Sequence, residues 1–228
     1  IFINCAQLTI PQVGSLAYYP NRDSLSYIPL YQLETAETFI RTTLRYAPFC
    51  IGWEKMVQAQ LTSDEEMVDT NGLSYAQFFQ DHLNKNQVEL NSPELIEQFH
   101  FLGFNDPTLI NKGTLSVAQI LQEILEAKWK LQSGDKDLIV MLHELEYSIN
   151  NKKFALQSSL VVKGDDELHT AMAKTVGLPL GIAAVLILEN KIAIKGLHIP
   201  IIKEIYEPVL AELIKEGIAF EETKTELQ

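Results

Sequence analysis

The sequence has little cysteine, and its spacing excludes the common metal motifs. The 228 residues contain two cysteines, Cys5 and Cys50, and no C-x-x-C pair. We expect both to be free thiols in a reducing cytosol, with a structural disulfide as the alternative. No H-E-x-x-H, G-x-S-x-G or phosphate-loop pattern occurs either. The sequence therefore predicts no bound metal and offers no catalytic nucleophile to assign.

A long hydrophobic run is also absent. The longest, Val176 to Leu188, has thirteen residues and is interrupted by Gly177, Pro179 and Gly181. A membrane-spanning helix needs about twenty apolar residues, so we expect a buried core helix here and no membrane partner. The sequence opens without methionine, and we expect it to be a piece of a longer, cytoplasmic protein.

Positive charge is scarce. The 30 acidic residues outnumber the 18 basic ones, which gives a net charge of −12 and a pI of about 4.8. Such a surface repels a phosphate backbone, so nucleic acid is not expected as a partner. Hydrophobic residues make up 46%, which is enough for the core of one large domain or two small ones.

Strands and helices are predicted in separate regions of the chain. Val13 to Tyr19 fits a strand. Thr38 to Tyr46 fits a helix or a strand by periodicity, and its threonines favour the strand, which places Arg41, Thr43 and Arg45 on one face. The middle of the chain carries helix-start and helix-end signals at Ser74, Ser92, Gly103 and Ser116.

After residue 138 the hydrophobic period changes to two, which predicts a β-hairpin. Apolar residues alternate over 139–149 and 154–162, and Asn150-Asn151 tolerates the positive φ of a tight turn. Two helices follow at about 169–188 and 202–215, with a short strand at 218–220. The predicted fold class is α/β (α+β-like), with a mixed sheet and a helical insertion.

Arginine usage is the sharpest functional signal. Only three of the 18 basic residues are arginines, and Arg22, Arg41 and Arg45 lie within 24 residues of one another. A guanidinium fork suits bidentate binding of a carboxylate, so these arginines form the candidate site. The alternative is that they form internal ion pairs with Asp23, Glu34 or Glu37.

The segment around Arg22 is dense in hydrogen-bonding groups. Tyr19, Asn21 and Asp23 are expected to shape the site, although a well-made turn would use the same residues. The five histidines are scattered without ligand spacing, and we expect His82 and the others to be structural.

Three segments together resemble saccharopine dehydrogenases. The first is Tyr19-Pro-Asn-Arg-Asp-Ser24, followed by Thr38-Phe-Ile-Arg-Thr-Thr-Leu-Arg-Tyr46. The second is Asp135-Lys-Asp-Leu-Ile-Val-Met141. The third runs from Thr170-Ala-Met-Ala-Lys-Thr-Val-Gly-Leu-Pro179 through Lys203-Glu-Ile-Tyr-Glu-Pro208 to Glu216-Gly-Ile218. Their order and spacing span nearly the whole chain. The sequence departs from the family at Thr42, where the family usually has glycine.

The resemblance implies part of a two-domain enzyme. In the family, a Rossmann domain binds NAD or NADP, and a second α/β domain binds the substrate and forms a homodimer. Residues 1–165 would be this substrate-binding and dimerisation domain, incomplete at its N-terminus. Residues 166–228 would return to pack on the cofactor domain, which is absent here. No catalytic or cofactor-binding residue is carried onto this chain, so we expect it to be inactive alone.

The resemblance also implies an activity, the interconversion of saccharopine with glutamate and 2-aminoadipate 6-semialdehyde in lysine metabolism. Saccharopine carries three carboxylates, so the three arginines are expected to bind and position it. Two alternatives stay open. One is a non-catalytic interaction or regulatory module that kept the family's fold, and the other is an enzyme for another N-linked amino-dicarboxylic acid.

Overall fold

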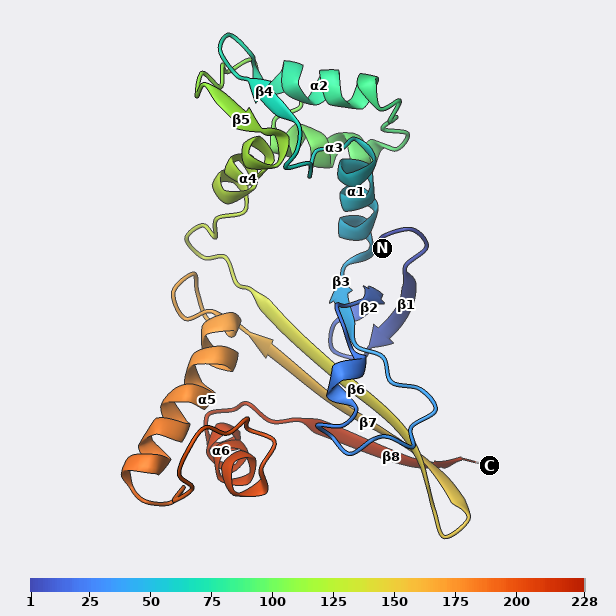
Figure 1. The fold of residues 1–228 in the computed structure, drawn as a ribbon, viewed down its shortest axis with the longest axis vertical. Coiled ribbons are helices and arrows are strands. Elements are labelled where there is room, and N and C mark those ends of the chain that lie inside the picture. Colours follow the sequence, from blue (N-terminus) through green and yellow to red (C-terminus); the bar gives the residue numbers. More distant parts are fainter. Residues whose placement is uncertain (228) are drawn as a thin grey trace. The chain divides into compact units, whose positions relative to one another are not determined.

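A computed structural model describes residues 1–227, which form two compact units, one of residues 1–130 and one that begins at Leu131. We call them the first unit and the second unit. The described residues contain eight strands, six α-helices and one 3-10 helix (Figure 1). The α/β class predicted from the sequence is confirmed, with three small antiparallel sheets where one mixed sheet was expected.

A three-stranded sheet begins the first unit. Its strands are β1 (Ala6–Ile10), β2 (Gly14–Pro20) and β3 (Thr42–Arg45), in the order β1-β2-β3. The strand predicted over Val13–Tyr19 is confirmed, whereas the one predicted over Thr38–Tyr46 forms only in its second half. The Arg41 N–H bonds the Ser24 hydroxyl at 3.2 Å instead of a strand carbonyl, so regular pairing stops at Thr42.

The rest of the first unit is the predicted helical insertion. Its elements are α1 (Ala47–Gln58), β4 (Met67–Asp69), α2 (Tyr75–Lys85), α3 (Pro93–Leu102), β5 (Thr114–Ser116) and α4 (Val117–Lys128). The Ser74 and Ser92 hydroxyls each accept a hydrogen bond from the N–H three residues later, and Ser116 with Gln119 forms a complete capping box. Each such cap contributes about 1 kcal/mol.

Aromatic side chains fill the core of this insertion. Phe78, Phe79 and Phe99 are at most 1% exposed, and they meet edge to face at centroid distances of 5.4 and 5.9 Å. His82 is buried beside them, with its ring 5.0 Å from that of Phe78. Its Nδ1 has no hydrogen-bond partner within residues 1–227. Burial is the main reason that the pKa of His82 is lowered, so the imidazole is held neutral.

The second unit contains the predicted hairpin. Strands β6 (Leu138–Ile149) and β7 (Lys152–Lys163) pair along their whole length, and Asn150 and Asn151 have φ of 52° and 62°. Strand β8 (Glu221–Leu227) adds to β7. The final strand thus lies after residues 218–220, where it was predicted. The prediction missed it because its charged sequence has no alternation of apolar residues.

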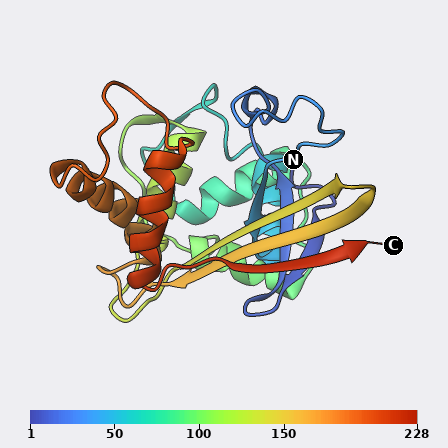
Figure 2. The same cartoon turned by 90° about the horizontal axis from the view of Figure 1, so that it is seen from below.

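Two helices pack beside this sheet, α5 (Ala171–Leu188) and α6 (Lys203–Lys215) (Figure 2). Asp137, just before β6, fixes the start of α5. Its carboxylate oxygens accept hydrogen bonds from the N–H groups of Ala171 and Met172 at 2.5 and 2.9 Å. An anionic group at this position satisfies two unpaired donors and complements the positive end of the helix dipole.

Helix α5 is not the buried core helix that the sequence predicted. Within it only Ala171 and Leu186 are buried, whereas Leu180 is 75% and Leu188 82% exposed. The helix is apolar on every side, and α6 and the sheet cover only part of it. It is the one described helix long and apolar enough to cross a membrane by length and composition alone. The expectation of no membrane partner therefore stays a prediction.

The compact units divide at a different place from the predicted domains. The sequence placed a boundary between residues 165 and 166, after the hairpin. In the structure the hairpin shares a hydrophobic core with α5 and α6, through Leu160 and Val162, so the division comes at Lys130. Whether residues 166–228 pack on a cofactor domain stays a prediction.

We predict that Asp137→Ala lowers the free energy of unfolding of the second unit by about 1–2 kcal/mol, because two helix N–H groups lose their acceptor. Asp137→Asn keeps one acceptor oxygen and should lose less. Urea unfolding followed by far-UV circular dichroism measures both variants, and equal stability of Asp137→Ala and the parent would contradict the role of the cap.

We also predict that buried His82 makes the first unit acid-sensitive. Its folded pKa lies below the unfolded value of 6.5, so the unfolded chain binds more protons as the pH falls. The stabilisation is present above pH 6.5 and is lost as the pH falls through the folded pKa. Urea unfolding followed by tryptophan fluorescence should give a free energy of unfolding that depends less on pH in His82→Gln than in the parent. A dependence as steep as the parent's would contradict the role of His82.

Candidate functional site

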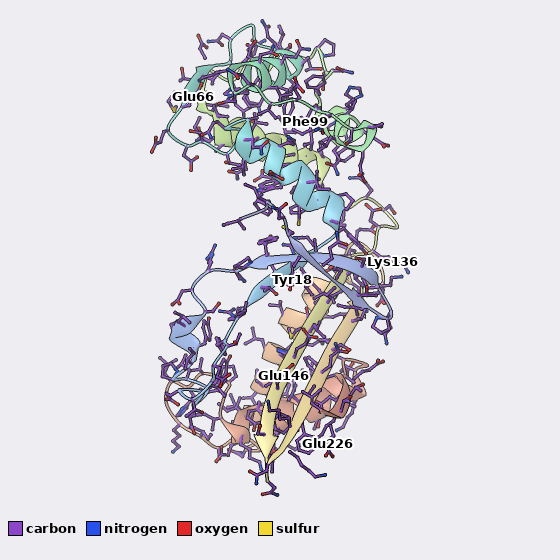
Figure 3. All side chains as sticks on the ribbon, turned by 90° about the vertical axis from the view of Figure 1, so that its right-hand side faces the viewer. Tyr18, Glu66, Phe99, Lys136, Glu146 and Glu226 are labelled. Atoms are coloured by element: carbon purple, nitrogen blue, oxygen red, sulfur yellow. The ribbon has the colours of Figure 1, made fainter. Side chains whose placement is uncertain are left out.

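The register of the first sheet places part of the candidate site on one face. Tyr19 of β2 lies opposite Thr43, and Ala17 lies opposite Arg45 of β3. Because side chains alternate along a strand, Tyr19, Thr43 and Arg45 share a face. Tyr18, labelled in Figure 3, points to the other face. The predicted shared face of Thr43 and Arg45 is therefore confirmed, and Arg41 lies just before the strand.

The chain between β2 and β3 forms a loop that is closed by its own hydrogen bonds. The Asn21 N–H donates to the Arg41 carbonyl at 2.9 Å. The Asn21 side-chain oxygen accepts from the Arg22 N–H at 2.8 Å, and Asp23 accepts from the Leu25 N–H at 2.9 Å. Hydrogen bonds from Ser26 and Leu25 lower the pKa of Asp23. Asn21 and Asp23 thus shape the turn that carries Arg22 and meets Arg41.

Arg41 is held by aromatic stacking. Its guanidinium carbon lies 4.2 Å from the centroid of the Tyr27 ring, within the range of a cation–π contact. Tyr27 stacks on Tyr31 at 6.0 Å, and Tyr31 lies 6.4 Å from Phe39. These three aromatic residues, Tyr27, Tyr31 and Phe39, were not predicted from the sequence as part of the site. The signal available was the density of aromatic residues between β2 and β3.

Arg45 and Arg22 are more exposed. Arg45 donates to the carbonyl of Leu44 at 2.8 Å, and its guanidinium carbon lies 5.7 Å from the Phe49 ring centroid. Arg22 lies on the exposed turn. The structure thus ties the backbone of Arg41 to the turn of Arg22 and places Arg45 on the neighbouring sheet face.

The ion pairs of the described residues involve lysine or histidine, and none involves an arginine. The arginines form no direct ion pair with Asp23, Glu34 or Glu37 in residues 1–227. Besides the hydrogen bonds from Ser26 and Leu25, the positive charge of Arg41 also helps to lower the pKa of Asp23. Guanidinium groups without a direct carboxylate partner can bind an external anion. Substrate binding by these residues stays a prediction.

The chemistry available at this site is binding and orientation. Cys50 is buried near it, and burial, with Cys5 as a neighbour, raises the pKa of its thiol to about 11, so it is protonated at neutral pH. Both cysteines are free thiols. Within the described part of the chain, no three His, Cys, Asp or Glu side chains form a metal-binding group.

The described residues thus form a mixed α/β fold with an arginine-bearing loop between β2 and β3. The chain belongs to the saccharopine dehydrogenase C-terminal domain family, whose model matches residues 2–218. The resemblance drawn from the three sequence segments is thereby confirmed.

Curated relatives match across nearly all of this chain. Alpha-aminoadipic semialdehyde synthase from Mus musculus is 32% identical over 233 residues, which cover 92% of this chain and 25% of that protein. The NADP(+)-dependent, L-glutamate-forming saccharopine dehydrogenase of Schizosaccharomyces pombe is 26% identical, covering 90% of this chain and 50% of that protein. The chain thus spans between a quarter and half the length of these relatives.

A solved structure has the same fold. Apo saccharopine dehydrogenase (L-Glu forming) from Saccharomyces cerevisiae superimposes with a TM-score of 0.80 and 24% sequence identity. The match covers 98% of this chain and 55% of that one. At this identity the likeness establishes the fold alone.

Proposed function

We propose that this chain is the substrate-binding portion of an NADP-dependent, glutamate-forming saccharopine dehydrogenase of lysine metabolism. Membership of the C-terminal domain family carries the proposal, and the names of the relatives from yeast and mammals agree with it. A cytoplasmic location and a homodimer remain part of the proposal.

The arginines of the loop between β2 and β3 and of β3 itself would position the substrate. Saccharopine is glutamate joined through its nitrogen to the side chain of lysine. Oxidation at that nitrogen gives an imine, and water then releases glutamate and 2-aminoadipate 6-semialdehyde. Arg41, pre-oriented by Tyr27, and Arg45 would each bind a carboxylate of the substrate. Holding the carboxylates fixes the reacting carbon, and such positioning can supply several kcal/mol of barrier lowering.

The nicotinamide cofactor would accept the hydride and would bind elsewhere in the enzyme. This chain has no strand followed by G-x-G-x-x-G, so none of its residues is assigned to a dinucleotide. The exposed apolar surface of α5 fits the proposal that the rest of the enzyme covers this helix.

We predict that Arg41→Ala, in the enzyme that contains this chain and its cofactor-binding part, lowers kcat/KM for saccharopine roughly ten- to a hundredfold. That is the range for losing a charge-assisted hydrogen bond. Arg41→Lys keeps the charge but not the guanidinium fork, so its kcat/KM should lie between those of the parent and Arg41→Ala. Lys55→Ala, on α1, is the matched control, because the side chain of Lys55 is half-buried and bonds Gln58. Unchanged saccharopine kinetics in Arg41→Ala and Arg45→Ala would remove the arginine site.

We further predict that the isolated chain oxidises no saccharopine, whereas the longer protein does so with NADP. Absorbance of the reduced nicotinamide measures both. A longer protein that folds and binds no NADP would instead support the alternative, a non-catalytic interaction or regulatory module. Activity on a different N-linked amino-dicarboxylic acid would keep the enzyme and change its substrate.

A further inference from the structure

A second candidate site lies in the helical insertion of the first unit. A cavity of about 450 Å³ opens between α1, α3 and the end of α4. This volume lies within the range of small-molecule sites. Its walls include four aromatic side chains and two carboxylates, namely Phe49, Trp53, Phe101, Trp129, Glu94 and Glu97.

The aromatic wall is preassembled from distant parts of the sequence. Phe49 and Trp53 of α1 stack with centroids 5.7 Å apart, and Trp129 lies 5.9 Å from Trp53 and 6.1 Å from Phe49. Trp129 is nevertheless 48% exposed, and Phe101 is 54% exposed. Rigid rings that keep a large exposed surface offer a stacking platform to an apolar ligand, with little ordering cost.

The charge of the lining is of one sign. Glu94 and Glu97 are the only charged side chains among the residues that line the cavity, and neither makes an ion pair within residues 1–227. Arg45 lies 5.7 Å from Phe49 but does not line the cavity. The two carboxylates are three residues apart on α3, so they lie on the same side of the helix.

The third polar side chain of the lining, Gln98, is engaged inside the protein. Its nitrogen donates to the Pro48 carbonyl at 3.1 Å, and its oxygen is buried against Gly52. The carboxylates of Glu94 and Glu97 are therefore the acceptors that the lining offers to a ligand. A ligand that complements them carries a positive charge and N–H donors.

We propose that this cavity binds a small organic cation with an aromatic body and a primary ammonium group. The ring stacks on the tryptophans and the ammonium group faces Glu94 and Glu97. The residues that line this cavity include none of Arg22, Arg41 and Arg45, although Phe49 contacts Arg45.

The chain offers a selective probe, because its only two tryptophans, Trp53 and Trp129, both line the cavity. Titration of the whole chain with 2-phenylethylamine should shift both indole N–H signals in nuclear magnetic resonance spectra and saturate. The neutral 2-phenylethanol should bind roughly five- to tenfold more weakly, since it lacks the charge. The anion 3-phenylpropanoate should give no saturable shift.

The double variant Glu94→Gln, Glu97→Gln should bind the amine five- to tenfold more weakly and the alcohol as the parent does. Glu89→Gln, at an exposed position outside the lining, is the matched control, and far-UV circular dichroism checks folding. Equal affinity for amine and alcohol, or an unchanged double variant, overturns the proposal. The absence of any shift also overturns the proposal. If Trp129→Ala then dissociates a dimer of the chain, this face is a contact between copies.

Discussion

Closure of the loop between β2 and β3 is the constraint on which the candidate site depends. The Asn21 N–H bonds the Arg41 carbonyl, and the Arg41 N–H bonds the Ser24 hydroxyl. These two hydrogen bonds end the ladder and bring together residues that are far apart in the sequence. Tyr27 then fixes the guanidinium of Arg41 from inside the loop. An arginine held this way has less side-chain entropy left to lose, so the loop preorganises the proposed site.

The fold was predictable wherever local chemistry decided it. The alternation of β6 and β7, the turn at Asn150-Asn151 and the caps at Ser92 and Ser116 all come from short-range rules, and they hold in the structure. The position of strand β8 was predicted wrongly because its own sequence has no strand pattern. It is a strand because it pairs with β7. The exposure of α5 was not predicted because the hydropathy of a segment does not show whether other parts of the protein cover it.

The candidate site was predictable as a set of residues and not as an arrangement. The scarcity of arginine singled out Arg22, Arg41 and Arg45, because the clustering of a rare residue type can be recognised from the sequence alone. The stacking of Arg41 on Tyr27 depends on the path of the loop, which no periodicity encodes. The cavity walls could not be predicted from the sequence for the same reason, because Phe49 and Trp129 lie at opposite ends of the helical insertion.

The position of β8 has a consequence for the order of folding. This strand completes the sheet by pairing with β7, and Lys152 bonds Glu226 across 74 residues of sequence. Both α5 and α6 lie in the intervening stretch. The contact order of the second unit is therefore high, and loop closure has to precede the last pairing. Until β8 pairs, one edge of β7 stays open, and an unpaired strand edge is where mispairing with another chain can occur.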